Sequence, residues 1–260
     1  MRIGLEIISL GLIFWLEGIF PLFQGRKHRL RHAFPNLGIG LLNGLVISLG
    51  FAAVTLKIIE TAEHHSWGLL RQFHGAPWIE GIVAFLLFDL WMYVWHRANH
   101  KIPLLWRFHR THHSDLELDS TSALRFHTGE IILSSLLRLI IIPFIGMQFI
   151  HLFIYELFLQ PVIIFHHSNV ALPEKLDRIF RAVIVTPNMH RVHHSQVRDE
   201  TDSNYSSIFS FWDRIARSFR RRKDTRTLVY GLPYLQEKDW QSLWGMLRTP
   251  FTNVQKKVAG

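Results

Sequence analysis

Histidine stands out in this chain, both in its number and in its spacing. The 260 residues contain 17 histidines and no cysteine. On a helix, offsets of three and four residues bring side chains onto one face, so histidines spaced in this way present their imidazoles together. Three short boxes have this spacing: His96 with His100, His109 with His112 and His113, and His190 with His193 and His194.

Clustered neutral imidazoles are typical of a transition-metal site. Imidazole nitrogen suits iron, zinc, copper and nickel, and one such ion takes about four to six ligands. Eight or nine converging imidazoles are therefore too many for one ion and suitable for two. Without cysteine, the chain has no disulfide, thiolate zinc site, cysteine-ligated iron–sulfur cluster or cysteine nucleophile. Solvated surface histidines are the ordinary alternative, which the repeated His-x-x-His-His box disfavours.

Long apolar runs predict the elements that position these boxes. An integral membrane protein is indicated, because so many runs of about bilayer-spanning length would need a very large water-soluble core. We therefore predict an all-α fold, a multispan bundle of four to five membrane helices with a histidine-rich cytoplasmic cap. The first run is expected to be an anchor rather than a cleaved signal, since basic residues follow it. The runs are Ile3 to Phe23, Leu37 to Ile58, Trp78 to Trp95, Ile131 to Ile150 and the shorter His151 to Phe165.

The basic residues predict the orientation. If the first run crosses toward the cytoplasm, 25 of the 29 lysines and arginines lie on the cytoplasmic side, as the positive-inside rule requires. The histidine boxes and the carboxyl terminus are then cytoplasmic. Anionic lipid explains the net charge of +9, so no nucleic-acid partner is expected. We expect a single domain over 1–260, with a membrane part to residue 166, a cytoplasmic segment at 96–130, and a cap over 167–260 docked on the helices.

Several motifs occur in order between about Phe88 and Trp212. On them the chain resembles the fatty acid hydroxylase/sterol desaturase superfamily of membrane histidine-box di-iron oxygenases, especially its short bacterial-type members. It departs from the family pattern after Arg214, where Ile215 to Phe219 replace a Phe-Gly-Thr-type turn, and this bears on cap docking more than on the metal site. The matching motifs are Trp95-His96-Arg97 with His100, Trp106-Arg107-Phe108-His109 leading to His112-His113-Ser114, Ala123-Leu124-Arg125-Phe126-His127, His167-Ser168-Asn169, Thr186-Pro187-Asn188 to Ser195, Asn204-Tyr205 and Trp212-Asp213-Arg214.

The resemblance implies two iron ions and oxygen-dependent hydroxylation or desaturation of a C–H bond in a lipid. The lipid would be a sterol, a carotenoid or a fatty acyl or alkyl chain, and no catalytic residue beyond the metal ligands is implied. His166 and His127 rank below the other candidate ligands. Residue by residue, the match implies as ligands His96, His100, His109, His112, His113, His167, His190, His193 and His194.

The resemblance also implies partners. With no cysteine and no glycine-rich dinucleotide loop, the chain needs an external electron donor, such as a ferredoxin, a cytochrome or a flavoprotein reductase. The expected location is a bacterial inner membrane, or the endoplasmic reticulum in a eukaryote. Two alternatives remain open: a membrane zinc-dependent hydrolase and a non-catalytic metal- or lipid-binding membrane protein. Dependence on oxygen and a reductant separates the oxygenase from both.

Acids near the boxes are candidates to orient the imidazoles. Asp115, Asp119 and Glu130 follow the second box, and Asp89 lies within a predicted span, where an acid is costly and functional by default. Asp89 is expected either to face the bundle interior or to pair with Arg138. The remaining histidines are interpreted as surface or interfacial residues, namely His28, His32, His64, His65, His74 and His151.

Overall fold

The part of the chain that can be described is helical. The computed structural model describes residues 2–72 and 75–253, which contain helices and isolated bridges but no strand. The long helices are α1 (Arg2–Ile19), α2 (Arg29–Gly50), α3 (Ala52–His64), α4 (Pro77–Lys101), α6 (Thr128–Ile145) and α7 (Phe149–His167). The short helices are α5 (Pro103–His113), α8 (Glu174–Phe180), α9 (Pro187–His193), α10 (Arg198–Thr201), α11 (Phe211–Ile215) and α12 (Leu243–Arg248).

Four of the described helices are long and apolar enough to cross a membrane: α2, α4, α6 and α7. They carry large apolar side chains on their outer surfaces, such as Leu49 at 86% and Ile140 at 62% exposure. Such exposure suits lipid rather than water. The predicted multispan α-helical bundle is thereby confirmed. The first apolar run forms α1, which contains Glu6 and Glu17 and is not one of the four.

Two of the apolar runs have different bounds from those predicted. The single span expected over Leu37 to Ile58 is wrong, because α2 ends at Gly50 and a separate helix, α3, follows Phe51. Glycine has the lowest helix propensity after proline, which favours an end at this position. The last run, which looked short from apolarity alone, is extended by its two histidines into the 19-residue helix α7.

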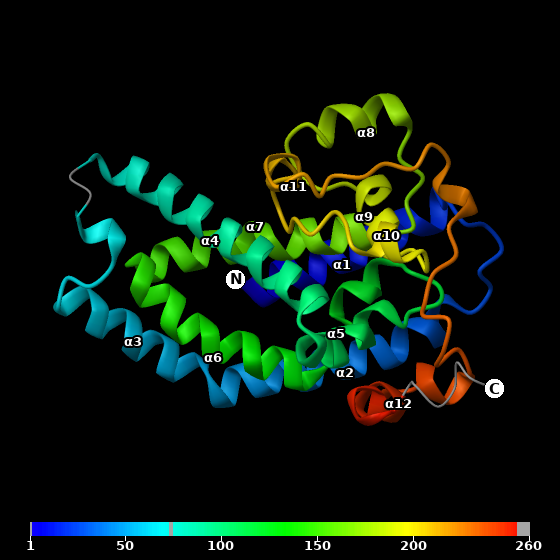
Figure 1. Cartoon of the computed structure of the whole chain (residues 1–260), viewed down its shortest axis with the longest axis horizontal. Coiled ribbons are helices and arrows are strands. Elements are labelled where there is room, and N and C mark those ends of the chain that lie inside the picture. The colour runs from blue at the N-terminus through cyan, green and yellow to red at the C-terminus, as the bar shows by residue number, and fades with distance from the viewer. Residues whose placement is uncertain (1, 73–74, 254–260) are drawn as a thin grey trace.

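The long helices run between two ends of the molecule (Figure 1). The carboxyl end of α3, the start of α4 and the junction between α6 and α7 lie at one end, and α5, α9 and α10 lie at the other. At the first end, Nη2 of Arg71 donates to the carbonyl of Gly146 at 2.9 Å. The long helices therefore return all three histidine boxes to the same end.

The cap docks on the bundle through Asp89. This fully buried carboxylate on α4 accepts from the Tyr155 hydroxyl at 2.8 Å, from Nε1 of Trp212 at 2.9 Å and from the backbone N–H of Phe209 at 3.1 Å. Asp89 thus faces the bundle interior, as expected. The alternative pairing with Arg138 is wrong, because Arg138 pairs with a carboxylate on α7. Asp89 joins two membrane helices to the cap.

The turn that departs from the family pattern still docks. Arg217 takes the left-handed conformation with φ of 57°, which glycine adopts at least cost. The next residue, Ser218, is bonded through its hydroxyl to the Tyr93 hydroxyl on α4 at 2.8 Å and donates to Oδ1 of Asp213 at 2.7 Å. The turn with the unusual sequence therefore contacts α4 through Ser218, and its positive φ lies at Arg217.

Candidate metal centre

Each histidine box lies at a helix end near the cap. His96 and His100 occupy the last turns of α4, which continues beyond the apolar run as predicted. The short helices α5 and α9 both begin with proline at their first position, Pro103 and Pro187, where the missing N–H costs nothing. These helices present the second and third boxes on helical turns, so the predicted spacing applies to all three boxes.

Nine histidines converge into two buried groups, and they are the nine ranked first from sequence. Within each group, one ring nitrogen per residue lies within 4.8 Å of the others, an arrangement that could hold a metal ion. The second box contributes to both groups, so neither group is formed by one box alone. The first group is His96, His100, His109, His113 and His193, and the second is His112, His167, His190 and His194.

The segment after α10 orients two histidines of the first group. Nδ1 of His96 donates to the carbonyl of Tyr205 at 2.8 Å, and Nδ1 of His193 donates to the carbonyl of Ser203 at 2.7 Å. Between these carbonyls, Asn204 has φ of 53°, a left-handed conformation that asparagine tolerates. A carbonyl only accepts, so each Nδ1 carries the proton and each Nε2 keeps its lone pair. Sequence analysis missed this role, because backbone carbonyls leave no residue-type signal.

An acidic side chain orients one more histidine of this group, and a second acid lies near another. Nδ1 of His109 donates to Oε1 of Glu130 at 2.9 Å, as considered for this acid from sequence. Nδ1 of His100 lies 3.5 Å from Oδ1 of Asp202, an acid that the sequence analysis did not single out. A carboxylate hydrogen-bonded in the way that Glu130 is to His109 fixes the ring and increases its basicity toward a metal.

The inward nitrogens of the first group fit a metal ion. Nε2 of His96, His109 and His193 is buried in each case without a hydrogen-bond partner among the described residues. A buried polar atom left unpaired costs free energy, so several such atoms facing each other call for a ligand. Unprotonated nitrogen is the donor that iron or zinc takes from histidine.

The second group has closely spaced Nε2 atoms. His167 Nε2 lies 3.1 Å from that of His112 and 3.0 Å from that of His190, which lies 3.1 Å from that of His194. With metal–nitrogen bonds of about 2.1 Å, ligands at right angles lie about 3.0 Å apart. Nδ1 of His167 donates to the carbonyl of Ile163 at 2.8 Å, which leaves its Nε2 as the ligand atom.

Five of the grouped histidines that lie outside the membrane helices are held neutral. Burial lowers their pKa well below 6.5, and repulsion between neighbouring imidazoles, were they protonated, lowers it further. The neutral ring is the form that binds a metal. These residues are His112, His113, His190, His193 and His194.

The two lower-ranked candidates lie outside both groups. The His166 ring is buried and stacks on that of His190, with centroids 4.0 Å apart. His127 uses both ring nitrogens elsewhere: Nδ1 accepts from the backbone N–H of Gly129 at 2.9 Å, and Nε2 donates to the carbonyl of Leu247 at 3.1 Å. His127 is therefore the N-cap residue of α6, and it also bonds this helix to Leu247 in the segment 167–260.

The expectation for the remaining histidines is partly wrong. His28, His64 and His65 are exposed as expected, and His74 lies outside the described residues. His151 is 8% exposed, and its Nδ1 accepts from the backbone N–H of Gln148 at the start of α7. Because His151 lies in the first turn of α7, its ring can accept from the backbone at the helix start. The position of His151 between two apolar runs did not indicate this contact.

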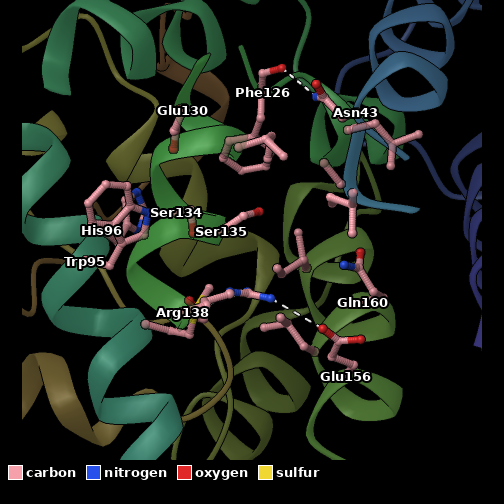
Figure 2. A pocket seen from close by; sticks show the side chains of 18 of the residues that line it. Asn43, Trp95, His96, Phe126, Glu130, Ser134, Ser135, Arg138, Glu156 and Gln160 are labelled. Carbon is pink, nitrogen blue, oxygen red and sulfur yellow. Dashed lines mark hydrogen bonds and ion pairs between the residues drawn. The ribbon is translucent and has the colours of Figure 1, made fainter. Parts of the chain in front are cut away.

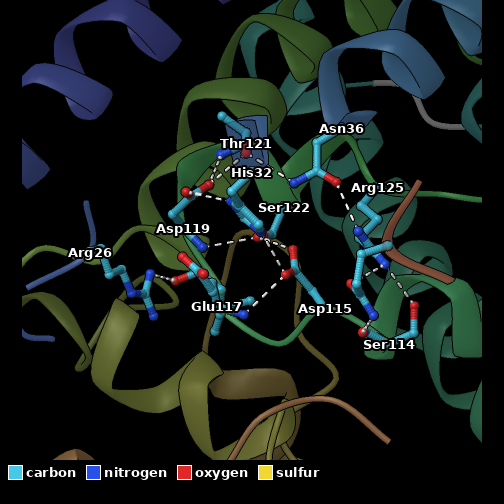
Figure 3. Close-up of polar contacts among 12 residues, drawn as sticks. Arg26, His32, Asn36, Ser114, Asp115, Glu117, Asp119, Thr121, Ser122 and Arg125 are labelled. Carbon is cyan, nitrogen blue, oxygen red and sulfur yellow. Dashed lines mark hydrogen bonds and ion pairs between the residues drawn. The ribbon is translucent and has the colours of Figure 1, made fainter. Parts of the chain in front are cut away.

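His32 is the histidine whose role differs most from the prediction (Figure 3). Its Nε2 lies 2.7 Å from Oδ1 of Asp115, and its Nδ1 lies 2.8 Å from Oδ2 of Asp119. Asp115 also accepts from the Ser122 hydroxyl at 2.6 Å. Burial acts to raise the pKa of Asp115, but the charges of His32 and Arg125 and these hydrogen bonds outweigh it and hold that pKa well below 3.8. His32 thus fastens α2 to the segment that follows the second box.

A cavity of about 450 Å³ lies inside the bundle beside the histidines (Figure 2). Both groups reach it, through His96 and His109 from the first and His112 from the second. Residues of α2, α3, α4, α6 and α7 form most of its walls, where apolar side chains such as Ile47, Met92 and Ile163 lie beside polar ones. Its size and the apolar parts of its walls suit a small lipid or a lipid chain.

The family can now be stated from comparison with known proteins. A family model described as fatty acid hydroxylase matches residues 81–218, a little over half of the chain and the part that carries all nine grouped histidines. The chain belongs to the fatty acid hydroxylase family. The superfamily resemblance drawn from the motifs is confirmed.

Among its family relatives are enzymes named for lipid hydroxylation. Human alkylglycerol monooxygenase is 30% identical over 89% of this chain and 48% of its own length. Alkylglycerol monooxygenase of Caenorhabditis elegans is 27% identical over 98% of this chain and 50% of its own length. The ornithine lipid hydroxylase OlsE of Rhizobium tropici is 30% identical over 81% of this chain and 64% of its own length. The chain spans about half the length of the alkylglycerol monooxygenases it matches, and no solved structure matches it.

Proposed function

We propose that this fatty acid hydroxylase family member is an integral membrane oxidoreductase that hydroxylates a C–H bond of a lipid with molecular oxygen. The observation that carries the proposal is the pair of buried imidazole groups bordering a membrane-level cavity. Hydroxylation is preferred over desaturation because the relatives are named as hydroxylases and monooxygenases. The proposed ligands are the nine histidines of the two groups, and the proposed cofactor is a pair of iron ions.

The contacts suggest separate roles for the iron ions and for the residues around them. Iron, when bound, would supply the activation of oxygen and the oxidation of the C–H bond. The chain's own residues bind the metal through Nε2 and hold the Nδ1 protons on fixed acceptors, namely Glu130 and the carbonyls of Ser203 and Tyr205. The apolar cavity wall would position the lipid and exclude water. Electrons would come from a separate ferredoxin, cytochrome or flavoprotein.

Metal analysis tests the ligand sets. The full chain is purified in detergent after expression with iron, beside His193→Ala from the first group, His112→Ala from the second, and His64→Ala as an exposed control. We expect about two irons per chain in the natural protein and the control, and a loss of iron in both group variants. Folded natural protein without metal would contradict the proposal.

Turnover tests the reaction class. Lipid extracts are incubated with the purified protein, oxygen and a reducing system, and the products are compared with those formed under nitrogen. We expect a product 16 mass units heavier than its precursor, formed only with both oxygen and the reductant. Hydrolysis products formed without oxygen would support the zinc hydrolase instead.

The orientation of the histidine end is a separate part of the proposal. The start of α4 lies at the opposite end of the bundle from α5 and α9 (Figure 1). Reporter fusions after residue 75 and at the carboxyl terminus are therefore expected on opposite sides of the membrane, with the carboxyl terminus cytoplasmic. Reporters on the same side would contradict this topology.

A further inference from the structure

The short helix α8 in the cap exposes its apolar side. Leu176, Ile179 and Phe180, with Val183 in the turn that follows, have the i, i+3, i+4, i+7 spacing that places side chains on one helix face. A helix of a water-soluble domain buries such a face against the core. Here the four side chains are between 45% and 66% exposed. The apolar face of α8 therefore points away from the rest of the cap.

The inward side of α8 is charged instead. Asp177 is fully buried and pairs with Arg181, which is also buried. The backbone carbonyl of Arg181 accepts from Nη2 of Arg214 at 2.6 Å and from the Ser210 hydroxyl at 2.7 Å. Because Arg214 lies on α11, these bonds fasten the charged side of α8 to α11 and hold the apolar side outward.

The exposed apolar side chains adjoin the lipid-facing surface of the bundle. The Phe158 ring on α7 is 56% exposed, and its centroid lies 5.9 Å from that of Phe85 on α4. The Phe85 centroid lies 5.7 Å from that of Phe209, which lies 5.2 Å from that of Phe211 at the start of α11. Ile184, directly after the apolar face of α8, forms a bridge with Phe209. Figure 1 shows α8 and α11 together on the side of the bundle where α4 and α7 lie.

Basic side chains border the same face. Lys175 and Arg178 are exposed on α8, and Arg217 is exposed directly after α11. Exposed apolar side chains grouped in this way mark a protein partner or a membrane. Their continuity with the lipid-facing aromatic rings favours the membrane. Apolar residues flanked by lysine and arginine are typical of a helix that lies in the interface of a bilayer with anionic headgroups.

We propose that the cap docks on the bilayer surface through the exposed apolar side chains of α8 and α11, here called the outer face, with Lys175 and Arg178 at anionic headgroups. The segment 181–186 joins α8 to α9, so this contact would hold the third histidine box at a fixed depth relative to the membrane. The proposal does not depend on the reaction. The outer face consists of Leu176, Ile179, Phe180, Val183 and Ile215.

Spin labels test the proposal, because a chain without cysteine can be labelled at one chosen position. Ile179→Cys and Ile215→Cys carry a nitroxide in the full chain, reconstituted in nanodiscs of phosphatidylcholine and phosphatidylglycerol. Collision with oxygen, which concentrates in lipid, is compared with collision with a water-soluble nickel chelate. Leu41→Cys on α2 is the lipid-facing reference. Val229→Cys is the matched cap reference, since Val229 is 62% exposed against 66% for Ile179 but is not part of the outer face.

We expect the ratio of oxygen to nickel collisions at positions 179 and 215 to be several-fold higher than at 229 and to approach that at 41. Ratios at 179 and 215 equal to that at 229 would overturn the proposal, because the outer face would then lie in water. Poor collision with both reagents, together with dipolar broadening between labelled chains, would overturn it in favour of a second copy. Thermal unfolding midpoints equal to that of the natural chain show that each labelled chain is folded.

A charge variant tests the headgroup contact. In Lys175→Gln/Arg178→Gln, the collision ratio at position 179 is expected to fall in the nanodiscs with phosphatidylglycerol and to stay unchanged in phosphatidylcholine alone, because only the anionic headgroups attract these bases. Arg226→Gln, an exposed base outside α8 and α11, is the control and should leave the ratio unchanged. An unchanged ratio in the double variant would overturn the assignment of Lys175 and Arg178 to headgroups.

Discussion

Nδ1 of His109 donates to Oε1 of Glu130 at 2.9 Å, although the two residues lie 21 positions apart and on different helices, α5 and α6. The bond connects the second histidine box to the first turn of a membrane helix. That helix also carries Arg138 into the cavity. The geometry of the metal centre and the wall of the cavity are therefore set by the same element.

Replacing Glu130 is expected to weaken metal binding without removing a proposed ligand. In Glu130→Leu the His109 ring loses its acceptor, and outer contacts of this kind contribute about 10- to 100-fold in metal affinity. Glu130→Gln keeps an acceptor oxygen, so its metal affinity is expected to lie between that of the natural chain and that of Glu130→Leu. Iron retention against a competing chelator measures the effect, with Glu63→Gln on exposed α3 as the control. Natural affinity in Glu130→Leu would contradict this role.

His127 is expected to matter for stability and not for metal. Its ring caps α6 and bonds Leu247, so His127→Ala should cost about 1 kcal/mol, as loss of a helix cap does. In a chain of this size the thermal midpoint would fall by about 2–4 °C. Iron content should stay at the natural level. A loss of iron in His127→Ala would instead place this residue among the ligands.

The contribution of His127 should depend on pH. Burial lowers the pKa of His127 below its usual 6.5 and outweighs the opposing effects of Leu247 and Glu130, so the folded chain favours the neutral ring. Protonation of Nδ1 would also remove the bond from Gly129. The stabilisation is thus fully present above pH 6.5 and is lost as pH falls through the lowered pKa. The difference in thermal midpoint between natural chain and His127→Ala should shrink in acid, and a constant difference would count against this assignment.

His32 should be one of the most sensitive positions outside the metal groups. Its ring lies between two buried carboxylates, Asp115 and Asp119. In His32→Leu both carboxylates would lose the imidazole that pairs with them. Breaking a buried ionic pairing costs about 3–5 kcal/mol. We expect little folded protein from His32→Leu and partial recovery when Asp119→Asn is added. Yield of monodisperse protein measures this, with exposed His28→Leu as the control.

Arg217→Gly is expected to stabilise the cap. Arg217 is exposed in the left-handed region, where a side chain costs about 1–2 kcal/mol, and glycine offsets part of that gain through its flexible unfolded state. A net gain of about 0.5 kcal/mol follows, seen as a higher thermal midpoint. The neighbouring Arg220→Gly has no positive φ to relieve and should lower the midpoint. A decrease in both variants would show that the Arg217 side chain makes a stabilising contact.

Much of the fold follows from local pattern. Apolar runs of about bilayer-spanning length favour helices, and histidines three and four residues apart share a helix face whatever surrounds them. The spacing of His96 and His100, or of His190 and His194, therefore predicts both an element and a shared direction. The same reasoning misplaced the end of α2, because apolarity continues through Phe51 while the helix does not.

The tertiary structure alone decided how the boxes combine. His109 and His113 join one group and His112 the other, although all three lie on one short helix. Their division depends on where α4, α7 and α9 meet α5, and His32 and Glu130 acquire their partners from segments far along the chain. Helical spacing is set by backbone hydrogen bonds within a few residues, whereas these contacts depend on how distant helices pack. No local pattern in the sequence records that packing.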